Sequence, residues 1–143
     1  MSTWKNVVVG VDGSESSDKA LLWAAAEAAH HDADLTVVNV WAHTLLPPAG
    51  SVSVSEKYVP DPSQRTAEDL LNEIKEVLGQ DPPVLVQPVV KQGNPAEVLI
   101  QESSNAQLLV VGTRGHGGFR GLVLGSVSQH VAAYAKCPVA VVR

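Results

Sequence analysis

Short runs of Val, Leu and Ile alternate along the chain with longer segments whose apolar residues recur at helical spacing. The short runs are almost continuously apolar, which is typical of parallel strands covered on both faces, whereas a half-exposed strand would alternate. The order of elements predicts an α/β fold with one five-stranded parallel sheet and helices on both of its faces. The expected strands are Asn6–Val11, Leu35–Val40, Val84–Val90, Leu108–Val111 and Val139–Val142.

The first two expected helices have recognisable ends. Ser14 can cap the first helix with its hydroxyl. Asp61 before Pro62 marks the start of the second helix, and Gly79 marks its end. The connection Trp41–Pro60 is the one long irregular segment and is either a lid or a simple excursion. The apolar stripe of the second helix is formed by Ala67, Leu70, Leu71, Ile74, Val77 and Leu78.

The last two helices begin with polar capping residues. Asn94, Pro95 and Glu97 open the third helix, with a cap followed by a proline at the first helical position. Ser126 starts the fourth helix as its cap, and Gln129 is placed to complete a capping box.

The expected strand order, 3-2-1-4-5, locates a binding site. In doubly wound sheets, ligands bind beyond the carboxyl ends of the strands, where the strand order reverses. With the first strand central and the fourth beside it, Asp12 and the loop after Val111 share one crevice. Segments that lie far apart in the sequence therefore meet at this point.

The loop between the fourth strand and the fourth helix is rich in glycine and basic residues. The loop contains Gly112, Gly115 and Gly125, and Ser126 directly follows Gly125 at the start of a helix. Glycine lets backbone N–H groups turn toward an anion, and a helix N-terminus adds unpaired donors and the positive end of a dipole. The combination predicts a phosphate-binding loop.

Simpler roles stay open for the same residues. Asp12 can form a turn and help to cap the first helix, Ser126 can act only as a helix cap, and the glycines can permit a tight loop without a ligand. Three familiar motifs are absent: the Walker A loop, the G-x-S-x-G hydrolase elbow, and the dinucleotide fingerprint, which fails at Arg120.

Composition restricts the possible partners. The chain has 143 residues, of which 45% are hydrophobic and 17% charged, and this suits one domain over residues 1–143. A net charge of −5 argues against a protein whose main task is binding nucleic acid. We expect no membrane span and a cytoplasmic location. The single cysteine, Cys137, fits a reducing compartment and is expected to be a small buried residue.

The glycine loop also carries a family resemblance. The pattern G-x-x-G, nine further residues, then G-S is matched at Gly112, Gly115, Gly125 and Ser126. Together with VVVGVDGSESSDKAL, LTVVNV, NPAEVLI and CPVAVV, it makes nearly the whole chain resemble the ATP-binding branch of the universal stress protein family. The resemblance implies a Rossmann-like fold of the adenine nucleotide alpha hydrolase-like type.

The resemblance assigns site residues. Asp12 would lie near the adenosine moiety, the backbone of Val40 would meet adenine, and Gly125 with Ser126 would supply donors to the phosphates. His116, like Arg114, lies where the family varies. ATP is the implied ligand, and either Mg²⁺ or Mn²⁺ could accompany it. The implied nucleotide-binding positions are Val11, Asp12, Val40, Gly112, Arg114, Gly115, Gly125, Ser126, Val127 and Ser128.

Three functions remain in competition. The favoured one is a nucleotide-dependent regulatory module of the stress response that works as a homodimer. The alternatives are a slow ATPase or adenylate-forming enzyme, and a structural dimer without a nucleotide. Binding is preferred to turnover because phosphate chemistry needs a metal clamp and a positioned base, and Asp12 is the one acidic candidate near the loop. The apolar last strand, Val139–Val142, is the expected dimer edge, with Pro138 at its start.

Overall fold

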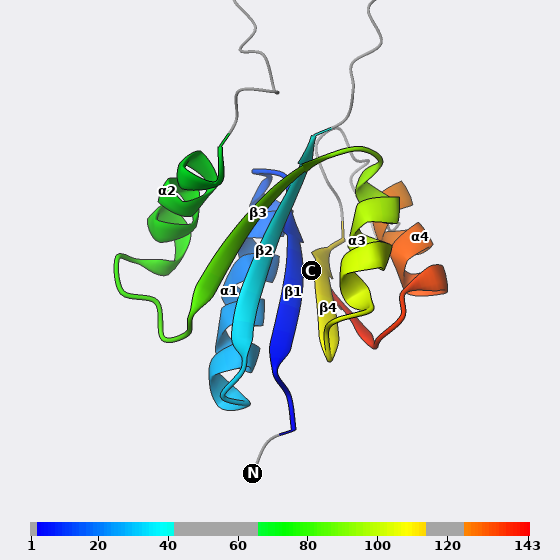
Figure 1. Cartoon of the computed structure of the whole chain (residues 1–143). Coiled ribbons are helices and arrows are strands. Elements are labelled where there is room, and N and C mark those ends of the chain that lie inside the picture. The colour runs from blue at the N-terminus through cyan, green and yellow to red at the C-terminus, as the bar shows by residue number, and fades with distance from the viewer. Residues whose placement is uncertain (1–2, 42–65, 114–124) are drawn as a thin grey trace, which may run out of the picture.

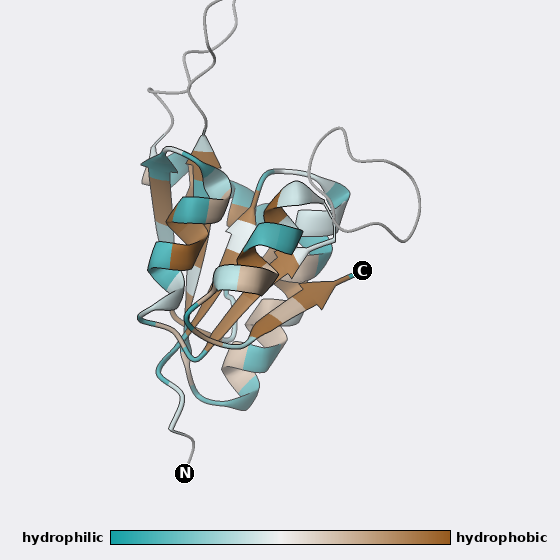
Figure 2. Cartoon of the chain, turned by 90° about the vertical axis from the view of Figure 1, so that its right-hand side faces the viewer, coloured by the Kyte–Doolittle hydropathy of each residue, from teal (hydrophilic) through white to brown (hydrophobic). Residues whose placement is uncertain are grey.

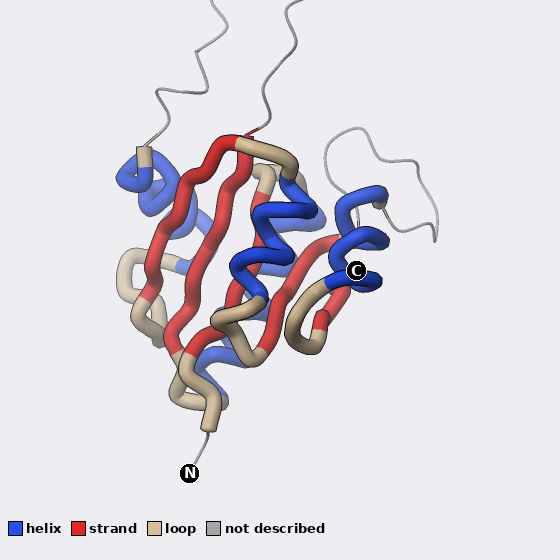
Figure 3. The backbone as a smooth tube through the Cα atoms, turned by 45° about the vertical axis from the view of Figure 1, so that its right-hand side comes forward, coloured by secondary structure: helices blue, strands red, loops and turns tan. Residues whose placement is uncertain are grey.

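The computed structural model describes residues 3–41, 66–113 and 125–143. Within these ranges, five parallel strands form one sheet in the order β3-β2-β1-β4-β5, which confirms the expected order. Helices lie on both sides of this sheet (Figure 3). The strands are β1 (Asn6–Val11), β2 (Asp34–Trp41), β3 (Val86–Gln92), β4 (Leu108–Gly112) and β5 (Val139–Val142).

The third strand lies two residues later in the sequence than expected. The run from Val84 predicted its start, but Leu85 is 71% exposed, and pairing with β2 extends from Val86 to Gln92. The bounds of β3 thus depend on its partner, because β2 continues to Trp41 and pairs with β3 up to that residue. Pro88 has no N–H to donate to a neighbouring strand. It is tolerated because β3 is an edge strand and pairs on one side only, with β2.

Two helices cover each face of the sheet. One face carries α1 (Glu15–His30) and α2 (Ala67–Leu78), and the other carries α3 (Pro95–Ser103) and α4 (Ser126–Tyr134) (Figure 1). The strands form the hydrophobic layer between them, and polar residues gather on the helices (Figure 2). This arrangement confirms the α/β architecture.

Strand β1 explains the continuous apolar run in the sequence. Val7 and Val9 pack into the core under α1 and α2, Val8 packs into the core under α3 and α4, and all three are 0% exposed. Burying one such side chain contributes about 1.5–3 kcal/mol, and a central strand receives this from both faces. The first strand is therefore central, as the order of elements predicted.

Three helices carry side-chain caps at their N-termini. The hydroxyl of Ser14 accepts the Ser17 N–H in α1, and the amide oxygen of Asn94 accepts the Glu97 N–H in α3. Both caps confirm the sequence-based expectation.

The predicted start of the second helix was wrong. Helix α2 begins at Ala67, because Thr66 and Asp69 form a reciprocal capping box: the Thr66 hydroxyl accepts the Asp69 N–H at 3.1 Å, and the Asp69 carboxylate accepts the Thr66 N–H at 2.9 Å. Thr66 itself is extended, so the helix cannot continue back through it. Asp61 and Pro62 lie outside the described residues.

The predicted cap of the fourth helix was also wrong. Gly125 is the N-cap of α4, and no side chain makes a capping hydrogen bond there. The Gln129 N–H donates to the Gly125 carbonyl at 3.0 Å, which is the first bond of the helix. Ser126 therefore already has a position inside the helix, one residue past the place where its hydroxyl could act as the expected cap.

Candidate functional site

The carboxyl ends of β1 and β4 lie side by side at the point where the strand order reverses. Val9 of β1 pairs with Val110 of β4, so the two strands reach the same edge of the sheet. In Figure 1 this edge is the upper one, where the N-terminus of α1 also lies. The structure thus brings Asp12 and the end of β4 to one place, as the topology predicted.

Asp12 forms the first turn at this edge. Its carboxylate accepts the Ser14 N–H at 2.9 Å, and its own N–H donates to the Ser17 hydroxyl at 3.2 Å. Between them, Gly13 has a φ of 82°, a left-handed conformation that favours glycine. Asp12 therefore has the turn-forming role that the sequence left open for it. Asp12 is exposed, so this turn does not bury its carboxylate.

Gly112, at the end of β4, is needed for helix packing. A Cβ on this residue would lie 2.4 Å from the Ser16 hydroxyl oxygen and 2.8 Å from the Ser16 carbonyl oxygen. Real side chains do not approach so closely, so only glycine lets β4 meet the first turn of α1. The glycine motif predicts a ligand contact for Gly112, but in the structure its lack of a side chain first serves the contact between β4 and α1.

Thr113 joins four elements. Its N–H donates to the Val142 carbonyl of β5 at 3.0 Å, and its carbonyl accepts the Gly125 N–H at the start of α4 at 2.7 Å. Its hydroxyl lies 3.5 Å from the hydroxyl of Ser16 in α1. Thr113 follows directly on the first glycine of the motif but is not among the site residues predicted from the sequence.

Ser128 fixes α4 against the same strand end. Its hydroxyl donates to the Gly112 carbonyl at 2.6 Å, and the residue is 4% exposed. The side chain assigned to phosphate binding is therefore engaged with the backbone of β4. Ser126 is exposed, and Val127 packs partly into the core under α3 and α4.

The N-terminus of α4 is thus held at the switch point by backbone and serine contacts. The first amides of any helix have no acceptor within the helix, and the peptide dipoles make this end electropositive. At α4 the cap is a glycine, which brings no oxygen to these amides. The arrangement can accept an anion from outside.

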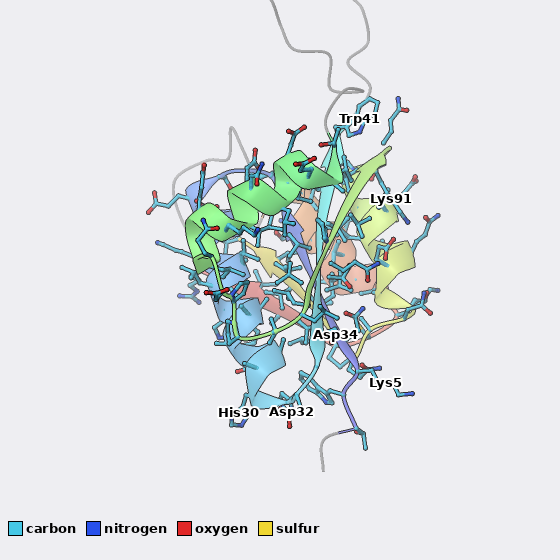
Figure 4. The ribbon with its side chains drawn as sticks, turned by 60° about the vertical axis from the view of Figure 1, so that its left-hand side comes forward. Lys5, His30, Asp32, Asp34, Trp41 and Lys91 are labelled. Carbon is cyan, nitrogen blue, oxygen red and sulfur yellow. The ribbon has the colours of Figure 1, made fainter. Side chains whose placement is uncertain are left out.

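The remaining predicted site residues lie further along the same edge or beyond the described chain. Val40 is half-buried on β2, where it pairs with Lys91 and packs against the core under α3 and α4. Figure 4 shows Trp41 and Lys91 at this end of the sheet, opposite Asp34. The loop positions Arg114, Gly115 and His116 fall outside the described residues.

The described ranges contain neither a candidate metal cluster nor a candidate membrane span. No group of three or more His, Cys, Asp or Glu residues there could hold a metal ion. None of the helices in those ranges presents an apolar stretch of the length that a bilayer requires.

Comparison with known sequences identifies the family. The family model of the universal stress protein family matches residues 3–143. The chain belongs to this family. A universal stress protein of Mycobacterium tuberculosis, Rv2623, is 39% identical over 140 residues, which cover 96% of this chain and 44% of that protein. One from Mycolicibacterium smegmatis is 36% identical and covers 99% of this chain and 49% of its own length.

The chain spans about half the length of these mycobacterial relatives. A putative universal stress protein of Staphylococcus aureus is closer in size: it is 33% identical, and the match covers 100% of this chain and 86% of that protein. The relatives therefore include both longer chains and chains of similar length.

Solved structures of the family share the fold. Universal stress protein UspA from Lactobacillus plantarum has a TM-score of 0.79 at 22% identity, and the match covers 100% of both chains. A universal stress protein in complex with cAMP has a TM-score of 0.70 at 27% identity, covering 99% of this chain and 98% of that one. The Rossmann-like fold expected from the sequence is confirmed.

Cys137 is half-buried beside the core under α3 and α4, where the sequence predicted a buried residue. Partial burial raises the pKa of its thiol, and a hydrogen bond from the Leu109 backbone offsets this effect in part. The neutral S–H donates to the Pro138 carbonyl at 3.4 Å. A thiol held in its neutral form is a poor nucleophile, so Cys137 is set aside as a catalytic residue.

Replacing Gly112 by Ala should destabilise the protein by roughly 1–3 kcal/mol, because the new methyl group collides with the Ser16 backbone. Urea denaturation measures the change. Ser16→Ala is the matched background: it removes the hydroxyl at 2.4 Å but leaves the carbonyl oxygen at 2.8 Å, so Gly112→Ala should remain destabilising in it. An unchanged denaturation midpoint for Gly112→Ala would contradict the close approach.

The thiol of Cys137 should react slowly with a thiol-specific disulfide reagent at about pH 8, compared with the same protein unfolded in urea. Because the folded-state pKa is raised, the unfolded chain loses its thiol proton first as the pH rises. The free energy of unfolding should therefore fall above the unfolded thiol pKa, and Cys137→Ala should flatten this dependence. Equal reaction rates in folded and unfolded protein would refute the assignment.

Proposed function

We propose that this universal stress protein binds an adenine nucleotide, with ATP as the ligand, at the ends of β1 and β4. Binding would change the shape or assembly of the protein, so that it acts as a nucleotide-dependent regulatory module in the stress response. The proposal assigns no catalytic residue.

One observation carries the proposal. Of the four helices in the described ranges, three have a side chain on their first-turn amides, from Ser14, Thr66 and Asn94. The fourth, α4, has Gly125 and no side-chain cap. Its start is bonded to Thr113 at the end of β4, and it follows the glycine loop in the sequence. A phosphate group supplies the acceptors and the negative charge that such an N-terminus lacks.

The residues divide into two groups around this helix end. The amides of Ser126, Val127 and Ser128 would receive the phosphates, and Gly125, whose own N–H is bonded to the Thr113 carbonyl, would contribute a cap without a side chain that lets the phosphates approach. Gly112 would hold β4 close to α1. The loop residues Arg114 and Gly115 would also contact the phosphates. Adenosine would lie toward the ends of the neighbouring strands, against Val11, Asp12 and Val40.

The comparison at 27% identity supports the choice of ligand class. That universal stress protein is in complex with cAMP, which shares adenine, ribose and one phosphate with ATP. ATP is preferred for this chain because its motif of G-x-x-G, nine further residues and then G-S resembles that of the ATP-binding branch of the family.

Binding without efficient turnover fits the described residues. Efficient phosphoryl transfer uses a metal held by carboxylates and a positioned base. Asp12 is the acidic residue at the switch point, and one of its oxygens is engaged with the Ser14 N–H. This arrangement favours the regulatory role over the ATPase and adenylate-forming alternatives.

The proposal includes a homodimer formed through β5. The described sheet has β3 and β5 as its two edge strands, and β3 carries Pro88 and Lys91, residues that discourage strand addition. Strand β5 consists of Val139–Val142, without charge or internal proline. Its outward backbone groups are those of Val139 and Val141, since Pro138 and Val142 direct their carbonyls toward β4.

The central test is Gly125→Asp. Gly125 has φ −64° and ψ 161°, which any residue can adopt, so the carboxylate can cap α4. We expect stability to stay equal or to rise by a few tenths of a kcal/mol, while ATP affinity falls more than about tenfold, because the carboxylate occupies the amides and repels phosphate. Calorimetric titration with ATP and urea denaturation measure the two effects.

Asn94→Asp is the matched control. It adds the same charge at another helix cap, where a side chain already accepts the Glu97 N–H, so ATP affinity should not change. If the unmodified protein binds no adenine nucleotide, or if Gly125→Asp binds ATP as well as the parent does, the proposal is wrong. Release of ADP at a rate that supports many turnovers during the titration would favour the enzyme instead.

For the dimer, the informative variant is Val141→Pro. It removes the N–H of Val141, one of the two outward N–H groups of β5, and leaves the bonds to β4, so we expect a monomer in sedimentation velocity. Val141→Ala is the control, because it loses similar side-chain packing and keeps the N–H, and it should sediment as a dimer. Dimers in both variants would exclude the β5 edge as the interface.

A further inference from the structure

The peptide group between Val11 and Asp12 is held on both sides by side chains. The Val11 carbonyl accepts a hydrogen bond from the Asn39 side-chain amide at 2.9 Å. The Asp12 N–H, which belongs to the same peptide group, donates to the Ser17 hydroxyl at 3.2 Å. Two separate elements, β2 and α1, therefore fix the orientation of one peptide plane.

This peptide lies where backbone pairing ends. The pairing of β1 with β4 runs from Val7 to Val9, and its pairing with β2 ends at Val11 opposite Asn39. Asn39 is half-buried, and it is the one amide side chain in an otherwise apolar second half of β2. Its side-chain hydrogen bond to the Val11 carbonyl therefore adds a second link between β2 and β1 at the last paired position, directly before Asp12.

Ser17 is well suited to the other half of the clamp. It is 4% exposed, and its hydroxyl donates to the Ser14 carbonyl at 3.1 Å while it accepts the Asp12 N–H. Both functions of the hydroxyl are thus used, and its direction is fixed. The clamp ties Asp12 to the first turn of α1, the same turn that contacts Gly112.

We infer that Asn39 is a positioning residue for the nucleotide site, acting through the Val11–Asp12 peptide on the carboxylate of Asp12. The inference rests on the proposed function. Ordering a flexible residue on binding costs conformational entropy and so weakens affinity. When the backbone of Asp12 is already oriented, that cost is smaller. Asn39 acts without touching the ligand.

The test compares two side-chain bonds that both join β2 to β1 at 2.9 Å. Asn39→Asp replaces the donor by an acceptor of the same shape facing the Val11 carbonyl. Thr36→Val removes the hydroxyl that donates to the Asn6 side chain at the opposite end of the strands. We expect Asn39→Asp to weaken ATP binding by about tenfold, the loss of one hydrogen bond with its polar partner left unpaired, and Thr36→Val to leave affinity unchanged.

A second readout is independent of the nucleotide. Amide hydrogen exchange followed by NMR in the ligand-free protein should show faster exchange at Asp12 in Asn39→Asp than in the parent, and no such change in Thr36→Val. Ser17→Ala, which opens the clamp from the other side, should reproduce the faster exchange at Asp12 and keeps the inference testable if Asn39→Asp does not fold.

The outcomes separate the two proposals. Unchanged exchange at Asp12 in both Asn39→Asp and Ser17→Ala, or faster exchange with unchanged ATP affinity, overturns the positioning role. A parent protein that binds no adenine nucleotide overturns the proposed function. Faster exchange at Asp12 in that case still supports the clamp as a feature of the fold.

Discussion

The candidate site depends on the contact between the end of β4 and the first turn of α1. That contact is possible because Gly112 has no side chain, and a Cβ there would overlap the backbone of Ser16. The close approach sets the position of Thr113, which in turn bonds to β5 and to the start of α4. A single missing methyl group thus allows helix α1, the sheet and helix α4 to meet at one point.

Most of the fold could be predicted from the sequence. Burial on both faces gives a strand a continuous apolar run, as in β1. Ser14 and Asn94 are local capping signals, and both cap helices in the structure. The start of α2 could not be predicted, since Asp61 with Pro62 and Thr66 with Asp69 are both valid start signals. Local chemistry does not rank such alternatives. The bounds of β3 depend on its partner β2, and that dependence is invisible in the segment itself.

The site was predictable to the extent that topology and motif determine it. Topology placed Asp12 beside the end of β4, and the glycine spacing drew attention to Gly112. Neither signal distinguishes a glycine that faces a ligand from one that faces a helix, which only the Ser16 contact reveals. Asn39 was missed because one amide at the end of a strand forms no motif, and its partner is a backbone carbonyl on another strand.

The uncapped start of α4 makes physical sense only together with its anchors. A side-chain cap is worth about 1 kcal/mol, and a glycine cap leaves most of the first-turn amides to water or to a ligand. The Ser128 hydroxyl bond to Gly112 and the Gly125 N–H bond to Thr113 hold this helix in place without using those amides. The helix end is therefore held in place although no side-chain cap is present at its N-terminus. The net charge of −5 opposes an anion only weakly there, because salt screens distant charges beyond roughly 8 Å, whereas the amides would act in direct contact. Local donors can therefore outweigh the charge of the whole chain, and an acidic protein can still present a phosphate site.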